Sequence, residues 1–201
     1  MWVTRDRGAH VLLVRTVPAG LTAVQGLERV ARVKTRYAGR FVQAINGISG
    51  SLTRQEDWFY FVNGYEADRS AAEYRLHPGD VEWWDYRSWK EGMRVPIVVG
   101  AFPEPFLHGW SGRTRPTIVV APPAFATPAR AIARRVHGNV VTTGGDVFPG
   151  KGDNAIVLKE GAPSIRVEGG TRPGSPVTFI VRARSDPLGV LRTARFHYSL
   201  P

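Results

Sequence analysis

Residues 57–64, Asp-Trp-Phe-Tyr-Phe-Val-Asn-Gly, decide how the first half of this chain folds. The five residues after the aspartate are aromatic or β-branched, which is typical of a strand, and the Asn-Gly pair that follows is a strong tight-turn former. Because side chains alternate along a strand, Trp58 and Tyr60 are expected on one face of the sheet. Phe59 and Phe61 are expected on the other face, so the segment predicts a sheet with aromatic side chains on both sides.

The segments around this strand extend the same pattern. Further strands are expected at residues 2–4, 11–16, 41–45 and 81–86, with turns at 46–47, 63–64 and 78–80. Apolar residues at helical spacing predict one helix over residues 21–30, and Thr22 with Gln25 has the spacing of a capping box. The order is strand, strand, helix, strand, strand, strand. One helix laid across a mixed sheet in this order is the β-grasp arrangement.

Composition changes near residue 110, because none of the six tryptophans follows Trp110. Residues 101–116 are rich in Pro and Gly and are expected to link two units. Residues 117–201 then contain several short β-branched strands and one helix that starts at Thr127-Pro128 and ends at His137-Gly138. The predicted fold class is α+β, with a β-grasp domain over residues 1–100, a linker, and a mostly β accessory domain over residues 117–201.

The net charge of +10 raises the question of nucleic acid. Residues 1–100 hold 14 basic and 11 acidic side chains, residues 101–201 hold 13 and 6, and no run of four basic residues occurs. A nucleic-acid footprint is clustered, so this spread disfavours such a partner. No apolar stretch reaches the length of a membrane-spanning helix, and the absence of cysteine excludes disulfides and thiolate chemistry from the chain.

Motifs for catalysis and metal binding are weak. Residues 145–152 come close to a phosphate-binding loop, but Gly152 stands where Ser or Thr would ligate magnesium, and a strand is expected to follow instead of a helix. Asp146, Asp153 and Asn154 in the same loop lack the spacing of a calcium loop. The five histidines show no metal-ligand spacing. We therefore expect no catalytic and no metal-binding residues, and the chain is not expected to be an enzyme.

One carboxylate pair, Glu82 with Asp85, lies on a predicted strand. Their spacing of three residues places them on opposite faces of the sheet, so they are not expected to act together on one substrate.

Three segments, residues 41–48, 57–64 and 74–83, together resemble the bacterial domain of unknown function 4430 family in their order, spacing and Asn-Gly and Gly-Asp turns. That family is similar to the C-terminal β-grasp domain of transcobalamin and intrinsic factor, and the resemblance covers about residues 1–90. It implies an extracytoplasmic domain, secreted or lipid-anchored, with a leader ahead of Met1. In the animal relatives this domain lies over one face of cobalamin, and a helical barrel domain, which this chain lacks, grips the other.

The aromatic side chains admit two interpretations. One helix can cover a single face of the sheet, so the second domain, a partner or a ligand is needed to cover the other. If a ligand covers it, Trp and Tyr form a stacking platform for a flat molecule, and Asn63 and Tyr65 reach the ligand from their turn. The residues expected in this ligand-binding site are Trp58, Tyr60, Asn63, Tyr65, Trp84, Tyr86 and Trp89.

Two hypotheses follow. In the first, the chain is a non-enzymatic extracytoplasmic binding protein for a cobalamin-like corrinoid or another flat cofactor, completed by a partner domain or served by a membrane importer. In the second, it is a cell-surface interaction or structural module whose aromatic residues are interdomain core. No resident cofactor is expected in either case.

Overall fold

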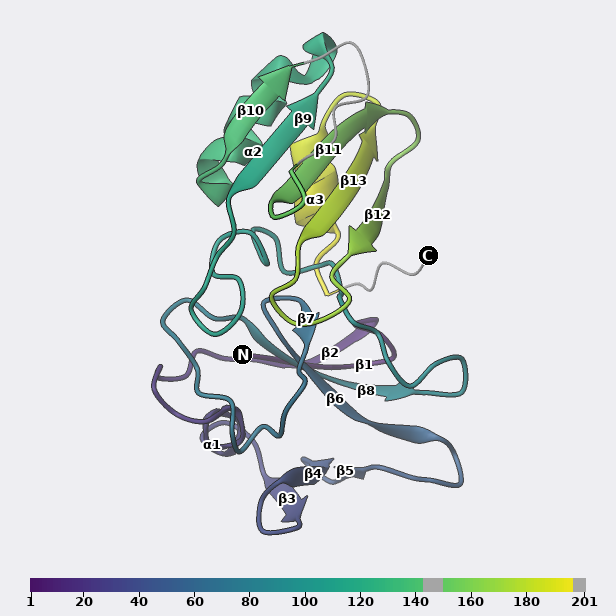
Figure 1. The fold of residues 1–201 in the computed structure, drawn as a ribbon. Helices are drawn as coiled ribbons and strands as arrows, with labels where there is room; N and C mark the ends of the chain where they lie inside the picture. The colour runs from purple at the N-terminus through teal and green to yellow at the C-terminus, as the bar shows by residue number, and fades with distance from the viewer. Residues whose placement is uncertain (143–149, 197–201) are drawn as a thin grey trace.

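A computed structural model describes residues 1–142 and 150–196 of the chain. The fold is α+β and mostly strands, as the sequence predicts, with an N-terminal half and a C-terminal half stacked one on the other (Figure 1). In this view the central sheet of the N-terminal half lies between a small helix and sheet layer below it and the C-terminal unit above it.

The central sheet has the strand order β2-β1-β8-β6-β7. Its members are β1 (Trp2–Arg5), β2 (His10–Val14), β6 (Glu56–Val62), β7 (Tyr65–Glu66) and β8 (Glu82–Ser88). Strand β1 pairs with β8 in parallel, whereas β6 pairs with β8 antiparallel. The first and last strands of this half therefore lie side by side at the centre, as expected for the β-grasp arrangement.

Helix α1 (Ala23–Glu28) lies beneath the central sheet and is shorter than the segment expected from the sequence. The predicted capping box is present: the Gln25 N–H donates to the Thr22 hydroxyl at 3.3 Å, and the Thr22 N–H donates to the Gln25 side chain at 3.0 Å. Val24 and Leu27 are buried, so the helix is held by its cap at one end and by its apolar face.

Removing the cap tests this account of α1. Thr22→Ala is expected to lower the free energy of unfolding by about 1 kcal/mol, because the Gln25 N–H loses its acceptor. Thr35→Ala, at an exposed position of a neighbouring strand, is the matched control and is expected to change stability by less than about 0.5 kcal/mol. Urea unfolding of both variants measures the difference, and equal losses would contradict a capping role.

Strand β4 (Phe41–Ile45) belongs to a separate three-stranded sheet. It pairs with β3 (Val33–Arg36) and β5 (Ile48–Ser49) and not with the central sheet, where the sequence analysis placed it. The Asn46-Gly47 turn joins β4 directly to β5, so that β4 pairs with the strand that follows it in the chain. This small sheet and α1 together cover the lower face of the central sheet (Figure 1).

The C-terminal half contains a second five-stranded sheet with the order β10-β9-β11-β13-β12. Its strands are β9 (Thr117–Ala121), β10 (Asn139–Thr142), β11 (Asn154–Glu160), β12 (Ser164–Gly169) and β13 (Val177–Ala183). Strands β10, β9, β11 and β13 are parallel, and β12 closes one edge antiparallel to β13. Parallel strands need crossover connections, and α2 supplies the one between β9 and β10.

Two helices, and not the single one expected, accompany this sheet. Helix α2 (Ala126–Val136) follows the turn η1 (Pro123–Phe125) and begins one residue before the predicted start at Thr127. It ends at Val136 with His137 as its C-cap, as predicted. Helix α3 (Pro187–Thr193) was missed, although Asp186 accepts from the Gly189 N–H at 2.8 Å and Pro187 occupies the first turn, both of which are helix-start signals. No helix within residues 1–142 and 150–196 is long and apolar enough to cross a membrane.

Residues 101–116 are packed between the two halves. Phe106 contacts Phe179 of β13 edge-on at 4.8 Å, and Trp110 lies 4.7 Å from the ring of Tyr74. Phe106 and Trp110 are both buried, and one apolar cluster runs from α1 through this segment to α3. The domain boundaries drawn from the sequence stay predictions, and the segment between them contributes to the core.

Candidate functional site

The predicted aromatic residues of β6 and β8 lie in register on one face of the central sheet. Trp58 is opposite Tyr86 and Tyr60 is opposite Trp84, with ring centroids 5.2 and 4.9 Å apart. The face they share is the lower one. The Trp58 indole N–H donates to the Ile48 carbonyl at 2.9 Å, and the Tyr86 hydroxyl donates to the Ser49 carbonyl at 3.0 Å. These rings form the interior of the N-terminal half, beneath the β3–β5 sheet.

Tyr60 is the half-buried member of this set, and its hydroxyl donates to the Arg69 carbonyl at 2.6 Å. Burial raises the pKa of the Tyr60 hydroxyl above its usual value. Trp89 lies one residue beyond the end of β8 and is also half-buried. Trp58, Trp84 and Tyr86 are buried. These predicted site residues therefore offer no exposed pair of rings on which a flat ligand could stack.

Asn63 and Tyr65 have their polar groups engaged by the protein. Asn63 is fully buried, its side-chain amide donates to Asp80 at 2.7 Å and to the Gly109 carbonyl at 2.9 Å, and its oxygen accepts from the Val81 N–H at 2.7 Å. The Tyr65 hydroxyl donates to the Ser175 carbonyl at 2.8 Å, across the joint between the two halves. Their contacts are structural, and a ligand role for either residue stays a prediction.

The second aromatic face is covered by the chain itself. Phe61 and Trp83 pack with Val98, and Trp2 stands edge-on to Phe196 at 4.4 Å. Gly8 permits this closure, since a side-chain carbon there would lie only 1.3 Å from the Phe196 carbonyl oxygen. Segments from far along the chain therefore supply the cover that the sequence analysis required.

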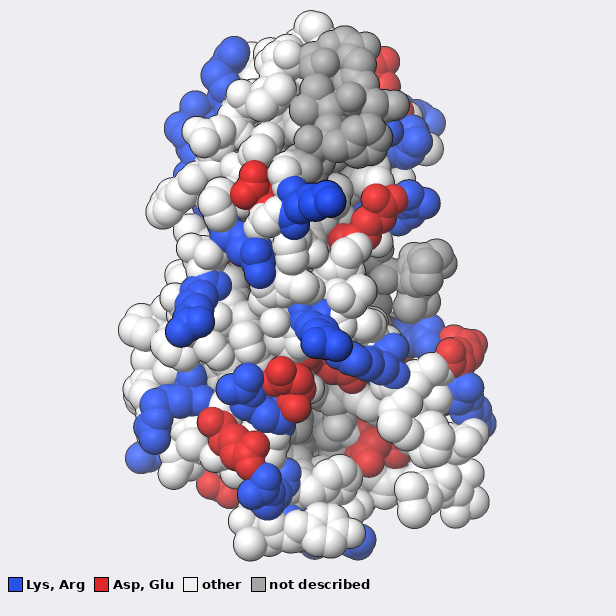
Figure 2. Space-filling model, in the orientation of Figure 1, with Lys and Arg blue, Asp and Glu red and all other residues white. Residues whose placement is uncertain are grey.

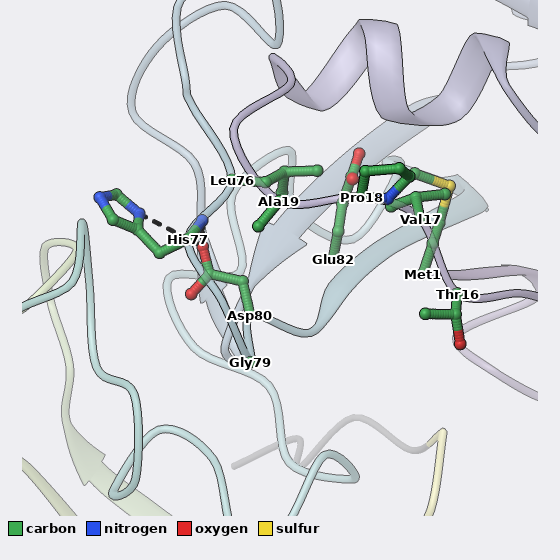
Figure 3. Close-up of a pocket in the computed structure, with 10 residues that line it drawn as sticks. All are labelled: Met1, Thr16, Val17, Pro18, Ala19, Leu76, His77, Gly79, Asp80 and Glu82. Atoms are coloured by element: carbon green, nitrogen blue, oxygen red, sulfur yellow. Dashed lines mark hydrogen bonds and ion pairs between the residues drawn. The ribbon is translucent and has the colours of Figure 1, made fainter.

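A pocket of about 210 Å³ opens beside this core, at the start of β8 (Figure 3). Its lining comes from the chain start, from the segment after β2 and from the turn before β8: Met1, Thr16, Val17, Pro18, Ala19, Leu76, His77, Gly79, Asp80 and Glu82. In Figure 3 the Glu82 carboxyl group extends towards Ala19 and Pro18, whereas the His77 ring points away from it. Both acidic side chains of this pocket, Glu82 and Asp80, are almost completely buried.

Glu82 is 1% exposed and only half satisfied. Its Oε1 accepts from the Trp84 indole N–H at 2.6 Å, and its Oε2 has no hydrogen-bond partner. Burial raises the pKa of Glu82 to about 8, against the opposing effect of the Trp84 hydrogen bond. Gly26 of α1 permits the close packing of Leu76 beside this group, because a side-chain carbon at Gly26 would lie only 2.9 Å from the Leu76 Cδ1. At neutral pH the carboxyl group therefore holds its proton most of the time.

Asp80, the other acidic residue of the pocket, already accepts hydrogen bonds from protein groups. Its carboxylate accepts from the His77 N–H at 2.9 Å, from Asn63 at 2.7 Å and from the Tyr74 hydroxyl at 3.2 Å. These bonds hold the Pro78-Gly79-Asp80 turn at the pocket, as the turn prediction requires. Asp80 supplies negative charge and shape, and Glu82 supplies the vacant hydrogen-bonding position.

Sequence reasoning considered Glu82 only as half of a carboxylate pair with Asp85. The structure places Asp85 on the opposite face, where it accepts from the Thr4 hydroxyl at 2.5 Å and the Gly8 N–H at 3.2 Å. The signal available in the sequence was the position of Glu82, whose side chain shares a face of the strand with Trp84 and Tyr86. The depth of its burial depends on α1 and on Leu76, which the local sequence does not reveal.

The remaining motifs gave no site. Residues 143–149, including Asp146 and most of the loop that resembles a phosphate-binding loop, lie outside the described part of the chain. Asn154 is buried, and its side-chain oxygen accepts from the Val177 N–H at 3.1 Å. This hydrogen bond joins β11 to β13. Among residues 1–142 and 150–196, no three His, Asp or Glu side chains gather so that they could hold a metal ion.

Charged side chains of both signs are interspersed over the N-terminal half on the face drawn in Figure 2. The N-terminal half also contains ion pairs between such side chains, among them Arg54 with Glu56 at 2.9 Å and Arg7 with Glu91 at 2.8 Å. No extended basic surface is seen over that half in this view. The absence of a nucleic-acid partner stays a prediction.

Comparisons with known proteins give one family and one solved structure. No curated protein matches the chain. A protein from Ruminococcus gnavus ATCC 29149, described as a "putative metal binding protein", is 17% identical in sequence and has a TM-score of 0.34; the similarity covers 43% of this chain and 92% of that one. So weak a likeness carries no argument about fold or ligand. Residues 20–88 match the family model described as Domain of unknown function (DUF4430), so this part of the chain is similar to that family.

Proposed function

We propose that this protein is a non-enzymatic binding protein whose DUF4430 domain holds a small ligand at Glu82. The observation that supports it is a carboxyl group 1% exposed, with Oε2 unpartnered, in the wall of a pocket of about 210 Å³. A buried polar atom without a partner costs free energy, so a site that keeps one is suited to a ligand that supplies the partner.

The ligand class that fits best is a small molecule with a primary ammonium group. When an ammonium group binds, the Glu82 proton is released to solvent. The ammonium then donates to the ionised Oε2 in a charge-assisted hydrogen bond, which is stronger than a bond between neutral groups. Asp80 adds a second negative charge to the same pocket. The volume corresponds to about seven water molecules, which limits the ligand to a few non-hydrogen atoms.

Binding of a cation at Glu82 is linked to pH. The groups that face this carboxyl group are Asp80, the amino group of Met1 and the indole N–H of Trp84, while α1 presents the uncharged Gly26. Because the pKa of Glu82 is about 8, an ammonium ligand must displace a proton below that pH. Affinity should therefore fall about tenfold for each unit that the pH drops below 8.

Calorimetric titration with ethylammonium chloride tests the proposal. Wild-type protein is expected to bind at least about tenfold more tightly at pH 8 than at pH 6, and Glu82→Gln is expected to abolish binding at both. Glu28→Gln is the matched control, because it removes an exposed carboxylate of α1 outside the pocket. Equal affinity in Glu82→Gln, or no saturable binding to the wild type at pH 8 up to about 50 mM, would contradict the proposal.

The family resemblance implies a larger ligand, a corrinoid or another flat cofactor, and titration with cyanocobalamin tests for it. The predicted stacking of a flat ring on Trp and Tyr needs exposed aromatic surface, and Trp58, Trp84 and Tyr86 are buried. We therefore expect cyanocobalamin to leave the absorbance spectrum and the heat signal unchanged. Saturable binding in the micromolar range would instead support the stacking platform.

A second function, an interaction or structural module, is favoured by the joint between the halves. Tyr65 bonds Ser175, and Phe61 and Trp83 are covered by Val98 and Phe196. Aromatic residues used in this way fix one half on the other and need no ligand. In that case the protein would show no response to ethylammonium or cyanocobalamin, and Glu82→Gln would change stability alone.

The family resemblance also supports an extracytoplasmic location, secreted or lipid-anchored, with a membrane importer as the partner that receives the ligand. Fractionation of the native organism followed by detection of the protein tests this part. Recovery in the secreted or envelope fraction is the expected result, and recovery with the cytosolic proteins would contradict it.

A further inference from the structure

The open face of the C-terminal sheet carries a group of basic side chains. Helices α2 and α3 pack against each other and lie on one side of the sheet, where Phe179, Val181 and Leu191 are buried in the common core. Side chains alternate along a strand, so Ile180 and Arg182 point to the other side, which no helix among residues 1–142 and 150–196 covers and which we call the open face. This face lies in the half of the chain that the DUF4430 match does not cover.

Strand register brings three cationic side chains together on this face. Lys159 of β11 is directly beside Arg182 of β13, and Arg182 is directly beside Ser164 of β12. One row along, Ile180 is beside Arg166 of β12. These residues line a pocket of about 280 Å³, formed by Lys159, Ser164, Arg166, Ile180 and Arg182.

Positive charge is concentrated in the lining of this pocket. Arg166 pairs with Glu168 on its own strand, and Arg182 donates to the backbone carbonyl of Glu160 at 3.3 Å, which steadies the guanidinium group without neutralising it. Lys159 is beside Arg182 in the parallel pairing of β11 and β13, so the two long cationic side chains share one row of this face. Among the described residues no carboxylate forms an ion pair with Arg182, and an anion in the pocket would supply the opposite charge.

We propose that this pocket binds a phosphate or sulfate group. Guanidinium groups match the oxygens of such groups with paired N–H donors, and a lysine adds a compact positive charge. The Ser164 hydroxyl supplies a further donor. The pocket volume accommodates one such group with a small substituent. The C-terminal half would then bind an anion, whereas the ligand proposed for the DUF4430 domain is a cation.

Titration of the full chain with inorganic phosphate and inorganic sulfate at constant ionic strength tests this site. Saturable binding with a dissociation constant in the millimolar range or below is expected for at least one of the two anions, and acetate should bind at least tenfold more weakly. Arg182→Gln and Arg166→Gln should each weaken binding at least tenfold. Arg192→Gln, which removes the same charge from α3 on the other side of the sheet, should change it less than twofold.

The comparison of anions separates the two sources of the ligand group. Preference for phosphate over sulfate, strengthening from pH 5 to pH 7 as phosphate gains its second charge, would identify a phosphate group. Preference for sulfate with no dependence on pH would identify a sulfate group. Equal losses in Arg182→Gln and Arg192→Gln, or no saturable binding of either anion, would overturn the proposal. Because Glu82 is not involved, failure here leaves the ammonium proposal untouched.

Discussion

Glu82→Gln is expected to make the protein about 3–5 kcal/mol more stable than the wild type at pH 9, and to change stability by less than about 1 kcal/mol at pH 5. The folded protein keeps the Glu82 proton up to a pKa of about 8, whereas the unfolded chain releases it near the ordinary value of 4.5. Between these values the folded state binds more protons, so wild-type stability falls as the pH rises from about 4.5 to 8 and is level above that.

Glutamine is neutral at every pH and cannot undergo this loss. Its oxygen can still accept from the Trp84 indole, and its amide nitrogen then occupies the position of Oε2 at the pocket. Urea unfolding of both proteins at pH 5, 7 and 9 measures the difference. Glu28→Gln, at an exposed site, is expected to run parallel to the wild type. A Glu82→Gln profile that also runs parallel would show that Glu82 is ionised in the folded protein.

Asn63→Ala is expected to lower the free energy of unfolding by about 3–4 kcal/mol. The change leaves the Val81 N–H, the Gly109 carbonyl and the Asp80 carboxylate without the bonds that Asn63 now makes, all in the protein interior. The backbone of Asn63 also has φ of 52°, a left-handed conformation that asparagine tolerates better than alanine.

Asn46→Ala is the matched control. Asn46 also precedes a glycine in a turn and has φ of 49°, but it is exposed and accepts a single bond, from the Arg32 N–H at 2.9 Å. Its loss is expected to cost about 1 kcal/mol, so the difference between the two variants isolates burial and the network around Asp80. Losses of equal size would mean that Asn63 serves only its own turn.

The local elements of the N-terminal half followed from the sequence. Alternation along residues 58–62 and 81–86 placed the aromatic side chains on the faces where they lie, because a strand has a fixed period of two. The capping box at Thr22 was also confirmed, since its bonds join residues three apart. Elements that depend on distant partners were harder to predict. The prediction assigned β4 to the wrong sheet, because the sequence of a strand does not specify which strand it pairs with.

The candidate site shows the same division. The sequence indicated that a second surface must cover the aromatic residues, and it left open whether a ligand or the chain provides it. Phe196 and Val98 provide it, from places in the chain that no local pattern connects to Trp83. In the sequence, Glu82 stood out only as one half of a possible catalytic pair. Its burial and the pocket beside it are formed by several segments that lie far apart in the chain, so no local pattern predicts them.

The carboxyl carbon of Glu82, followed by NMR as a function of pH with and without ethylammonium chloride, tests the binding proposal most directly. A pKa of about 8 is expected for Glu82 in the protein alone, and a lower pKa in the presence of ethylammonium, because the cation stabilises the ionised form. A pKa below about 5 that ethylammonium does not move would contradict it, since the carboxyl group would then already be ionised and satisfied in the free protein.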